Sequence, residues 1–177
     1  MHALPPSDLP QSDLSPSRRW WIKTLLINVS ILIIFAGVIQ LIPVSRDNPP
    51  VLREPVWDTP ETRALAQTAC FDCHSNETNW PWYARLAPVS WGIWYDVTEG
   101  REDLNFSEWA RHLDDDMVDP NDPFPPKTIS ERIEDEIRNG TMPPGTYRLL
   151  HPEARLSDAE KDALITGLLY TIQQSQE

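Results

Sequence analysis

The only two cysteines of the chain lie three positions apart, in the pentapeptide Cys70-Phe71-Asp72-Cys73-His74. C-x-x-C-H is the pattern to which a c-type haem is attached, because two thiols add across the porphyrin vinyl groups as thioethers and the adjacent imidazole becomes an axial iron ligand. Two intervening residues let both sulfurs reach the vinyls on one side of the ring. We therefore predict one covalent haem c, with Cys70 and Cys73 as attachment points and His74 as the proximal iron ligand.

Two other uses of this pattern are less well supported by the sequence. A thioredoxin-like redox dithiol would be expected within a βαβ pattern, which the surrounding sequence does not show. A zinc site would need a further Cys or His at metal-ligand spacing, which the sequence lacks. A disulfide framework is also excluded, because the chain's only cysteine pair belongs to the motif.

The second axial ligand is predicted from the segment Thr141-Met142-Pro143-Pro144. A thioether is a soft, neutral donor that favours ferrous iron when it stands opposite histidine, and a following proline stiffens the loop that holds it. We predict Met142 as the distal ligand, although it could instead fill a gap in the core. His151 is the main rival, followed by Met117 and His112.

Helix signals flank both parts of this site. Thr59 is an N-cap followed by Pro60 at the first helical position, which predicts a helix to about Ala69 that delivers Cys70 at its end. Isoleucines at positions 129, 133 and 137 share one helix face, and Asn139-Gly140 ends that helix just before Met142. Ser157 and Glu160 form a capping box, and the helix they open should pack against the helix before Cys70.

The interval between the two parts of the site is rich in aromatic and acidic residues. Pro88 could open a helix that Gly100 closes, and Asn105 to Glu108 should cap a short helix through about Leu113. Most of the aromatic side chains of residues 79–95 are expected in the core, and one or two could donate a hydrogen bond to a haem propionate. The acidic loop 114–123 lacks the ligand order of a calcium-binding loop.

An apolar segment near the N-terminus predicts a membrane anchor. Residues 24–45 carry no charge and are long enough to cross a bilayer as a helix. Three cations precede this span, so we expect the N-terminus in the cytoplasm and the rest of the chain outside, whereas a cleaved signal peptide is disfavoured by the length of the apolar run. The predicted organisation is a disordered cytoplasmic tail (1–19), a transmembrane signal anchor (20–45), a Pro-rich tether (46–56) and a c-type haem-binding domain (57–177).

The exported part is strongly acidic. The whole chain has a net charge of -12, and all but two of its 27 acidic residues follow the predicted span. Nucleic acid is therefore disfavoured as a partner, and a redox partner protein with a basic docking face is expected. The acidity could also simply keep the domain soluble.

Longer blocks of the sequence resemble a known family. The order of helix, C-x-x-C-H, isoleucine helix, N-G-x-M-P and capped final helix looks like the small mono-haem cytochromes c. The segments CFDCHSNETNWPWYARLAPVSW, GREDLNFSEW and MPPGTYRLLHPEARLSDAEKDAL more closely resemble the bacterial haem-binding domain family of membrane-anchored c-haem proteins, over roughly Pro49 to Leu169. The resemblance implies a covalent haem c on Cys70 and Cys73, with His74 proximal and Met142 distal.

Taken together, the sequence predicts an all-α, cytochrome c-like haem domain of short helices and long loops on a single transmembrane helix. The expected function is one-electron transfer outside the cytoplasmic (inner) membrane, as a carrier rather than an enzyme. Two alternatives remain open. An open sixth site would make the protein a gas or redox sensor or a weak peroxidase, and the haem domain could instead be a subunit of a larger membrane electron-transfer complex.

Overall fold

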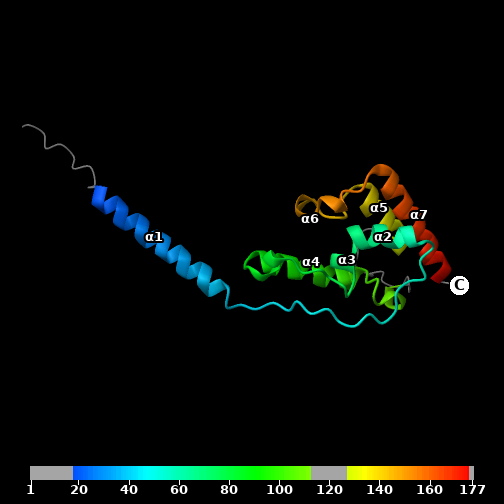
Figure 1. Cartoon of the computed structure of the whole chain (residues 1–177), viewed down its shortest axis with the longest axis horizontal. Coiled ribbons are helices and arrows are strands. Elements are labelled where there is room, and N and C mark those ends of the chain that lie inside the picture. Colours follow the sequence, from blue (N-terminus) through cyan, green and yellow to red (C-terminus); the bar gives the residue numbers. More distant parts are fainter. Residues whose placement is uncertain (1–17, 113–126, 176–177) are drawn as a thin grey trace, which may run out of the picture. The chain divides into compact units, whose positions relative to one another are not determined.

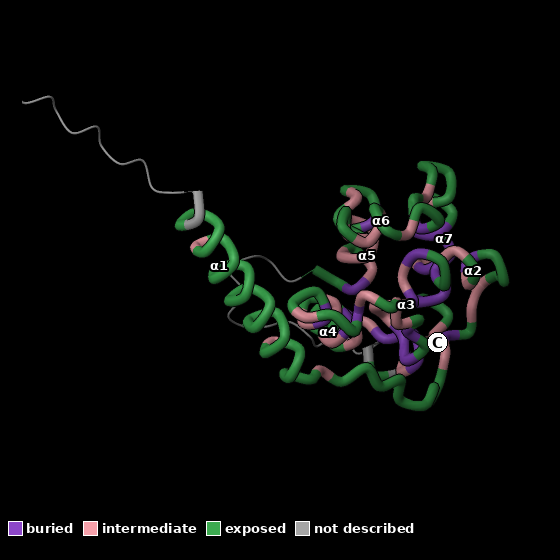
Figure 2. The backbone as a smooth tube through the Cα atoms, turned by 60° about the vertical axis from the view of Figure 1, so that its left-hand side comes forward, coloured by how far each residue is buried: buried purple, intermediate pink, exposed green. Residues whose placement is uncertain are grey.

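The computed structural model describes residues 18–112 and 127–175, in two units, Met1–Pro43 and Val44–Glu177 (Figure 1). The first unit contains helix α1 (Arg18–Ile39). Its stretch Trp20–Ile39 is long and apolar enough to cross a membrane, and none of these residues is buried (Figure 2). Large apolar side chains such as Leu32 and Phe35 are exposed within this unit.

The second unit is built from helices, and the described residues form no strand apart from an isolated bridge between Arg53 and Glu108. The predicted all-α class is therefore confirmed. In chain order the helices are α2 (Pro60–Ala69), α3 (Phe71–His74), the 3-10 turn η1 (Trp82–Arg85), α4 (Val89–Asp103), η2 (Trp109–His112), α5 (Ile129–Arg138), α6 (Gly145–Leu150), η3 (Pro152–Ala154) and α7 (Asp158–Ser175).

The helix before the attachment motif packs on the C-terminal helix, as predicted. The Thr59 hydroxyl accepts from the Thr62 N–H and caps α2, and Ser157 and Glu160 form the reciprocal bonds of a capping box at the start of α7. The two helices approach closely where Gly167 meets Thr62, because a methyl group at position 167 would overlap the Thr62 side chain. This crossing fixes the direction in which α2 delivers Cys70.

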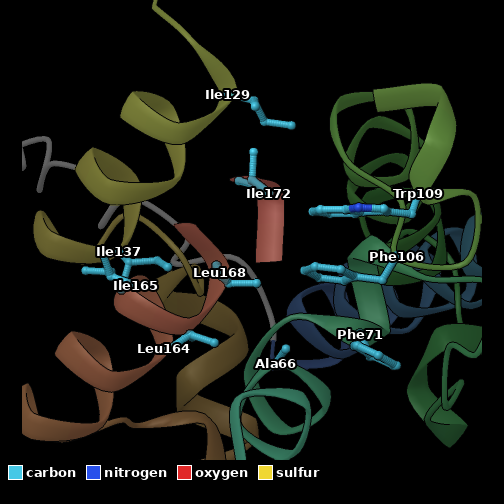
Figure 3. Packing of buried hydrophobic residues seen from close by; sticks show 10 residues of the cluster. All are labelled: Ala66, Phe71, Phe106, Trp109, Ile129, Ile137, Leu164, Ile165, Leu168 and Ile172. Atoms are coloured by element: carbon cyan, nitrogen blue, oxygen red, sulfur yellow. The ribbon is translucent and has the colours of Figure 1, made fainter. Parts of the chain in front are cut away.

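The core joins this helix pair to α5 and to a row of aromatic rings. Leu164, Ile165, Leu168 and Ile172 form the buried face of α7 and pack with Ile129 and Ile137 of α5 (Figure 3). Phe106 lies between Phe71 and Trp109, with ring centroids 5.4 and 5.8 Å away. Phe71 belongs to the attachment pentapeptide, so the motif is packed directly into the core.

Helix α4 continues past the glycine that was expected to end it. Gly100 is buried inside α4, and a Cβ there would lie only 2.8 Å from the carbonyl oxygen of Cys73. Its small size serves a close approach between two backbones rather than a helix stop. The helix expected at residues 105–113 is only the 3-10 turn η2, and Leu113, Met117 and the acidic loop 114–123 lie outside the described residues.

The segment predicted as a tether is hydrogen-bonded to the helical unit along part of its length. The backbone N–H groups of Leu52 and Arg53 donate to the Ser107 carbonyl at 2.9 and 3.0 Å. Nearer the anchor, Arg101 donates to the Asp47 carbonyl at 3.0 Å, and the Asn48 side chain donates to the Thr78 carbonyl at 2.8 Å. These bonds shorten the part of the segment that is free to act as a linker.

Candidate functional site

A cavity of about 300 Å³ lies within the second unit, at the lower end of the size range of ligand sites. Cys70, Cys73, His74 and Met142 all line it, although Met142 lies 68 positions after His74. The apolar part of the wall comes from several elements. It includes Leu104, Phe106, Ile129, Ile133, Ile137, Leu164 and Leu168.

The attachment pentapeptide forms a short helical turn at the end of α2. The Cys70 N–H donates to the Ala66 carbonyl, and the Cys70 carbonyl accepts from the N–H groups of Cys73 and His74 at 3.2 and 2.9 Å. The two thiols are not joined as a disulfide. Burial raises the pKa of both Cys70 and Cys73 to about 12, whereas a redox-active dithiol needs a lowered thiol pKa. The environment thus disfavours the thioredoxin-like alternative.

The His74 ring is oriented by a backbone carbonyl. Its Nδ1 lies 3.0 Å from the Leu104 oxygen, which can only accept, so Nδ1 carries the proton and Nε2 keeps its lone pair. Burial lowers the His74 pKa and so favours the neutral ring. A neutral imidazole whose other nitrogen donates to a carbonyl is the usual form of a metal-ligating histidine.

Residues 100–107 hold the motif from the other side through buried polar groups. The Ser107 hydroxyl accepts from the Asn76 N–H at 2.9 Å, and the Asn105 side chain donates to the Asn76 side chain at 2.9 Å. The Phe106 N–H donates to the His74 carbonyl at 2.8 Å. The sequence carries only a weak signal for this role, because the segment from Asn105 to Glu108 also fits the pattern of a helix cap.

The turn that brings Met142 to the cavity follows α5. Gly140 has a φ of 68°, in the left-handed region where glycine is unstrained. The N–H groups of Thr141 and Met142 both donate to the Glu136 carbonyl at 3.1 Å. The predicted helix end is therefore confirmed, and it carries the Met142 segment back to the cavity, where the side chain is 38% exposed.

The rival ligand His151 does not line the cavity. Its Nε2 is 3.0 Å from the Tyr83 hydroxyl, its Nδ1 is 3.2 Å from a Glu153 carboxylate oxygen, and its ring stacks on Tyr147 with centroids 4.1 Å apart. Both ring nitrogens thus have partners outside the cavity. Met117 and the side chain of His112, the other rivals, lie outside what the structure describes.

Charged side chains in the cavity wall are divided between elements. Asp96, Glu99 and Asp103 lie along α4, and partial desolvation of its carboxyl raises the pKa of Asp96. Arg132 lines the cavity from α5 and Arg148 from α6. Neither arginine belongs to a motif in the sequence, and the isoleucine pattern of α5 indicates only the apolar face of that helix.

These residues fit a haem in their chemistry. Two thiols are adjacent in one helical turn, an imidazole has a free lone pair, a thioether lies in the same cavity, and much of the wall is apolar. Soft sulfur and imidazole donors suit iron in a porphyrin better than a hard cation.

Comparison with known proteins agrees with this chemistry. One protein-family model, described as "Haem-binding domain", matches residues 34–169, which is more than half of the chain. Searches of curated proteins and of solved structures found no match.

Proposed function

This chain belongs to the haem-binding domain family, and from that premise we propose that it is a membrane-anchored mono-haem c-type cytochrome that transfers single electrons. The observation that carries the proposal is that one cavity is lined by Cys70, Cys73, His74 and Met142. These are the groups needed for two thioether bonds and an axial pair. The bound haem would supply a reversible one-electron change between ferric and ferrous iron.

Each residue of the set has a distinct task in this proposal. Cys70 and Cys73 would hold the porphyrin covalently, and His74 would bind iron through Nε2 while Nδ1 stays bonded to the Leu104 carbonyl. That bond fixes the ring plane and makes the imidazole a stronger donor. Met142 would supply the second iron ligand, and a thioether in that role would raise the reduction potential relative to a second histidine.

The location of the domain is part of the same proposal. Helix α1 is long and apolar enough to span a bilayer, and Arg18, Arg19 and Lys23 lie at its N-terminal end. Cations on that side favour a cytoplasmic N-terminus. The haem domain would then lie outside the cytoplasmic membrane and exchange electrons with a partner that has a basic docking face.

Optical spectroscopy of the full-length, haem-loaded protein in detergent tests the axial pair. We expect the ferric protein to show a methionine-to-iron band and the ferrous protein to ignore carbon monoxide, whereas Met142→Ala should lose the band and bind the gas. His151→Ala is the matched control and should behave as the wild type. Ready binding of carbon monoxide by the wild type would contradict the electron-transfer assignment and favour a sensor or a weak peroxidase with an open sixth site.

A further inference from the structure

Two arginines in the cavity wall each bury a nitrogen that has no hydrogen-bond partner. Among the described residues, three buried side-chain polar atoms lack a partner, and two of them are Arg132 Nε and Arg148 Nε. Leaving a donor of a charged group buried and unpaired costs several kcal/mol, so native proteins rarely do it. Both arginines line the cavity. A ligand bound in the cavity could supply an acceptor for these donors.

The missing acceptor should be a carboxylate or a similar planar anion. The Nε and Nη edge of a guanidinium matches two oxygens of a carboxylate. Arg148 already donates from Nη2 to the Gly140 carbonyl at 3.0 Å, which fixes its head group and leaves Nε unused. Of the ion pairs among the described residues, none includes Arg132 or Arg148.

The carboxylates of the protein that line the cavity do not fill this role. Asp72 accepts hydrogen bonds from the Tyr147 hydroxyl and the Asn79 N–H, and Glu136 accepts from the Thr141 hydroxyl. The remaining ones, on α4, are Asp96, Glu99 and Asp103. Three of the wall's carboxylates lie on α4 and only one, Glu136, lies on α5, so α4 should repel an anionic group of a ligand more strongly than α5 and α6 do.

We propose that Arg132 and Arg148 bind the two propionate carboxylates of the haem, an inference that rests on the proposed function above. The propionates leave the porphyrin at the edge opposite the vinyl groups that the cysteines capture. The arginines would thus set the orientation of the ring, with its acidic edge toward α5 and α6. Lys161 also lines the cavity, but it already pairs with Asp158 at 3.4 Å.

This arrangement would also couple the propionate to the distal segment. The Arg148 guanidinium holds the carbonyl of Gly140, the residue whose left-handed turn leads into Met142. A carboxylate on Arg148 Nε would add a second bond to the same guanidinium. The haem would then help to order the turn that supplies its own distal ligand.

The test compares Arg132→Gln, Arg148→Gln and the control Arg138→Gln in the haem-loaded, full-length protein. Arg138 lies on the same helix as Arg132 but is exposed and already pairs with Glu134 and Asp162. Arg138→Gln therefore removes one positive charge, as the other two variants do, without removing a partner from the cavity. Two quantities are measured: the pH at which the propionate signals titrate by nuclear magnetic resonance, and the midpoint reduction potential. Haem content and helicity are recorded for every variant.

We expect the propionate titration to move up by about one to three pH units in Arg132→Gln and Arg148→Gln, because each variant removes the opposite charge beside a carboxylate. The unpaired carboxylate should favour ferric iron, so the ferric-to-ferrous ratio at a fixed applied potential should rise up to about tenfold, which equals a fall of about 59 mV. Arg138→Gln should match the wild type in both. Arg132→Lys and Arg148→Lys keep the charge and should shift less than the glutamine variants.

The proposal is overturned if haem-loaded Arg132→Gln and Arg148→Gln show the same propionate titration and the same midpoint reduction potential as Arg138→Gln. Should the glutamine variants fail to fold, the same comparison is made with the lysine variants against Arg138→Lys. A change in their propionate signals supports the proposal, and identical signals overturn it. A wild-type protein that carries no haem would instead overturn the proposed function, and haem content reports this separately.

Discussion

The Tyr147 hydroxyl donates a 2.7 Å hydrogen bond to the carboxylate of Asp72, 75 positions earlier in the chain. Asp72 lies between the two cysteines of the attachment motif, and Tyr147 lies on α6, just after the Met142 segment. Both line the cavity. The bond therefore connects the segment that carries the attachment residues with the segment that carries the predicted distal ligand.

Removing this hydroxyl should destabilise the fold. We expect Tyr147→Phe to lower the free energy of unfolding of the haem-loaded protein by about 1.5–3 kcal/mol, the range for a hydrogen bond to a charged group. Burial, and after it the bond to Asp72, raises the Tyr147 pKa above its usual value. The phenol stays neutral, so its contribution should be complete below about pH 10, the unfolded pKa, and should disappear only as the pH rises through the higher folded pKa.

Denaturant unfolding at pH 7 and pH 9 measures this effect. Tyr95→Phe is the control, because Tyr95 is 58% exposed on α4 and should tolerate the loss of its hydroxyl. Equal stability of the two variants would show that the bond between Tyr147 and Asp72 contributes nothing to the fold.

A second prediction concerns two glycines on the same helix. Gly100→Ala should destabilise the protein by about 1–3 kcal/mol, because the new methyl group meets the Cys73 backbone, which cannot move aside without displacing the motif. Gly92→Ala should stabilise it by about 0.4–1 kcal/mol, since nothing lies within 4 Å of the added atom and alanine restricts the unfolded chain. Thermal unfolding of both variants checks the prediction, and a shift of the same sign in both would contradict it.

Local signals were sufficient to predict several helix boundaries. The caps at Thr59 and Ser157 and the glycine stop after α5 depend on hydrogen bonds within a few residues, so the sequence around them contains the needed information. The same holds for the attachment motif, whose spacing reflects the haem itself. The axial role of Met142 was also predicted from neighbouring residues, and it stays a prediction.

Other features depend on which segments meet in space. Gly100 looked like a helix stop because a glycine's local preference says nothing about the Cys73 backbone that packs against it. Arg132 and Arg148 carry no signal in the sequence, because only the arrangement of α5 and α6 brings them to the wall of one cavity. Helix α6, which carries Tyr147, has no side-chain cap, so the local sequence did not predict it.

The ion pair between Glu54 and Arg63 predicts a dependence of stability on pH. Arg63 donates from Nε and Nη2 to the two carboxylate oxygens at 2.9 Å each, and Trp57 adds a bond at 3.1 Å. The bond to Arg63 is the largest cause that lowers the Glu54 pKa. A lowered carboxyl pKa stabilises the fold above the unfolded pKa of about 4.3, and the contribution is lost as the pH falls through the folded pKa.

Glu54→Gln should therefore be less stable than the wild type at pH 7, by about 0.5–1 kcal/mol because both side chains are partly exposed. The difference should shrink as the pH falls below about 4, because the wild-type carboxyl then becomes protonated and is neutral like the glutamine. Unfolding curves from pH 7 to pH 3 measure it. A difference that stays constant over this range would show that the charge of Glu54 has no part in the effect.

The acidic side of the cavity predicts a preference for cationic redox partners. Asp96, Glu99 and Asp103 line the cavity and are exposed on α4, so negative charge lies where a partner would approach the haem. For the haem-loaded protein, we expect Glu99→Gln to slow electron exchange with a trivalent metal–ammine complex about two- to threefold at low salt and to speed exchange with an anionic cyanide complex.

Glu61→Gln on α2 removes the same charge away from the cavity and should change neither rate appreciably. Stopped-flow rates at two ionic strengths measure the effect, which should vanish near 1 M salt, where charges are screened within about 3 Å. Equal effects of Glu99→Gln and Glu61→Gln would place the approach of the partner elsewhere on the domain.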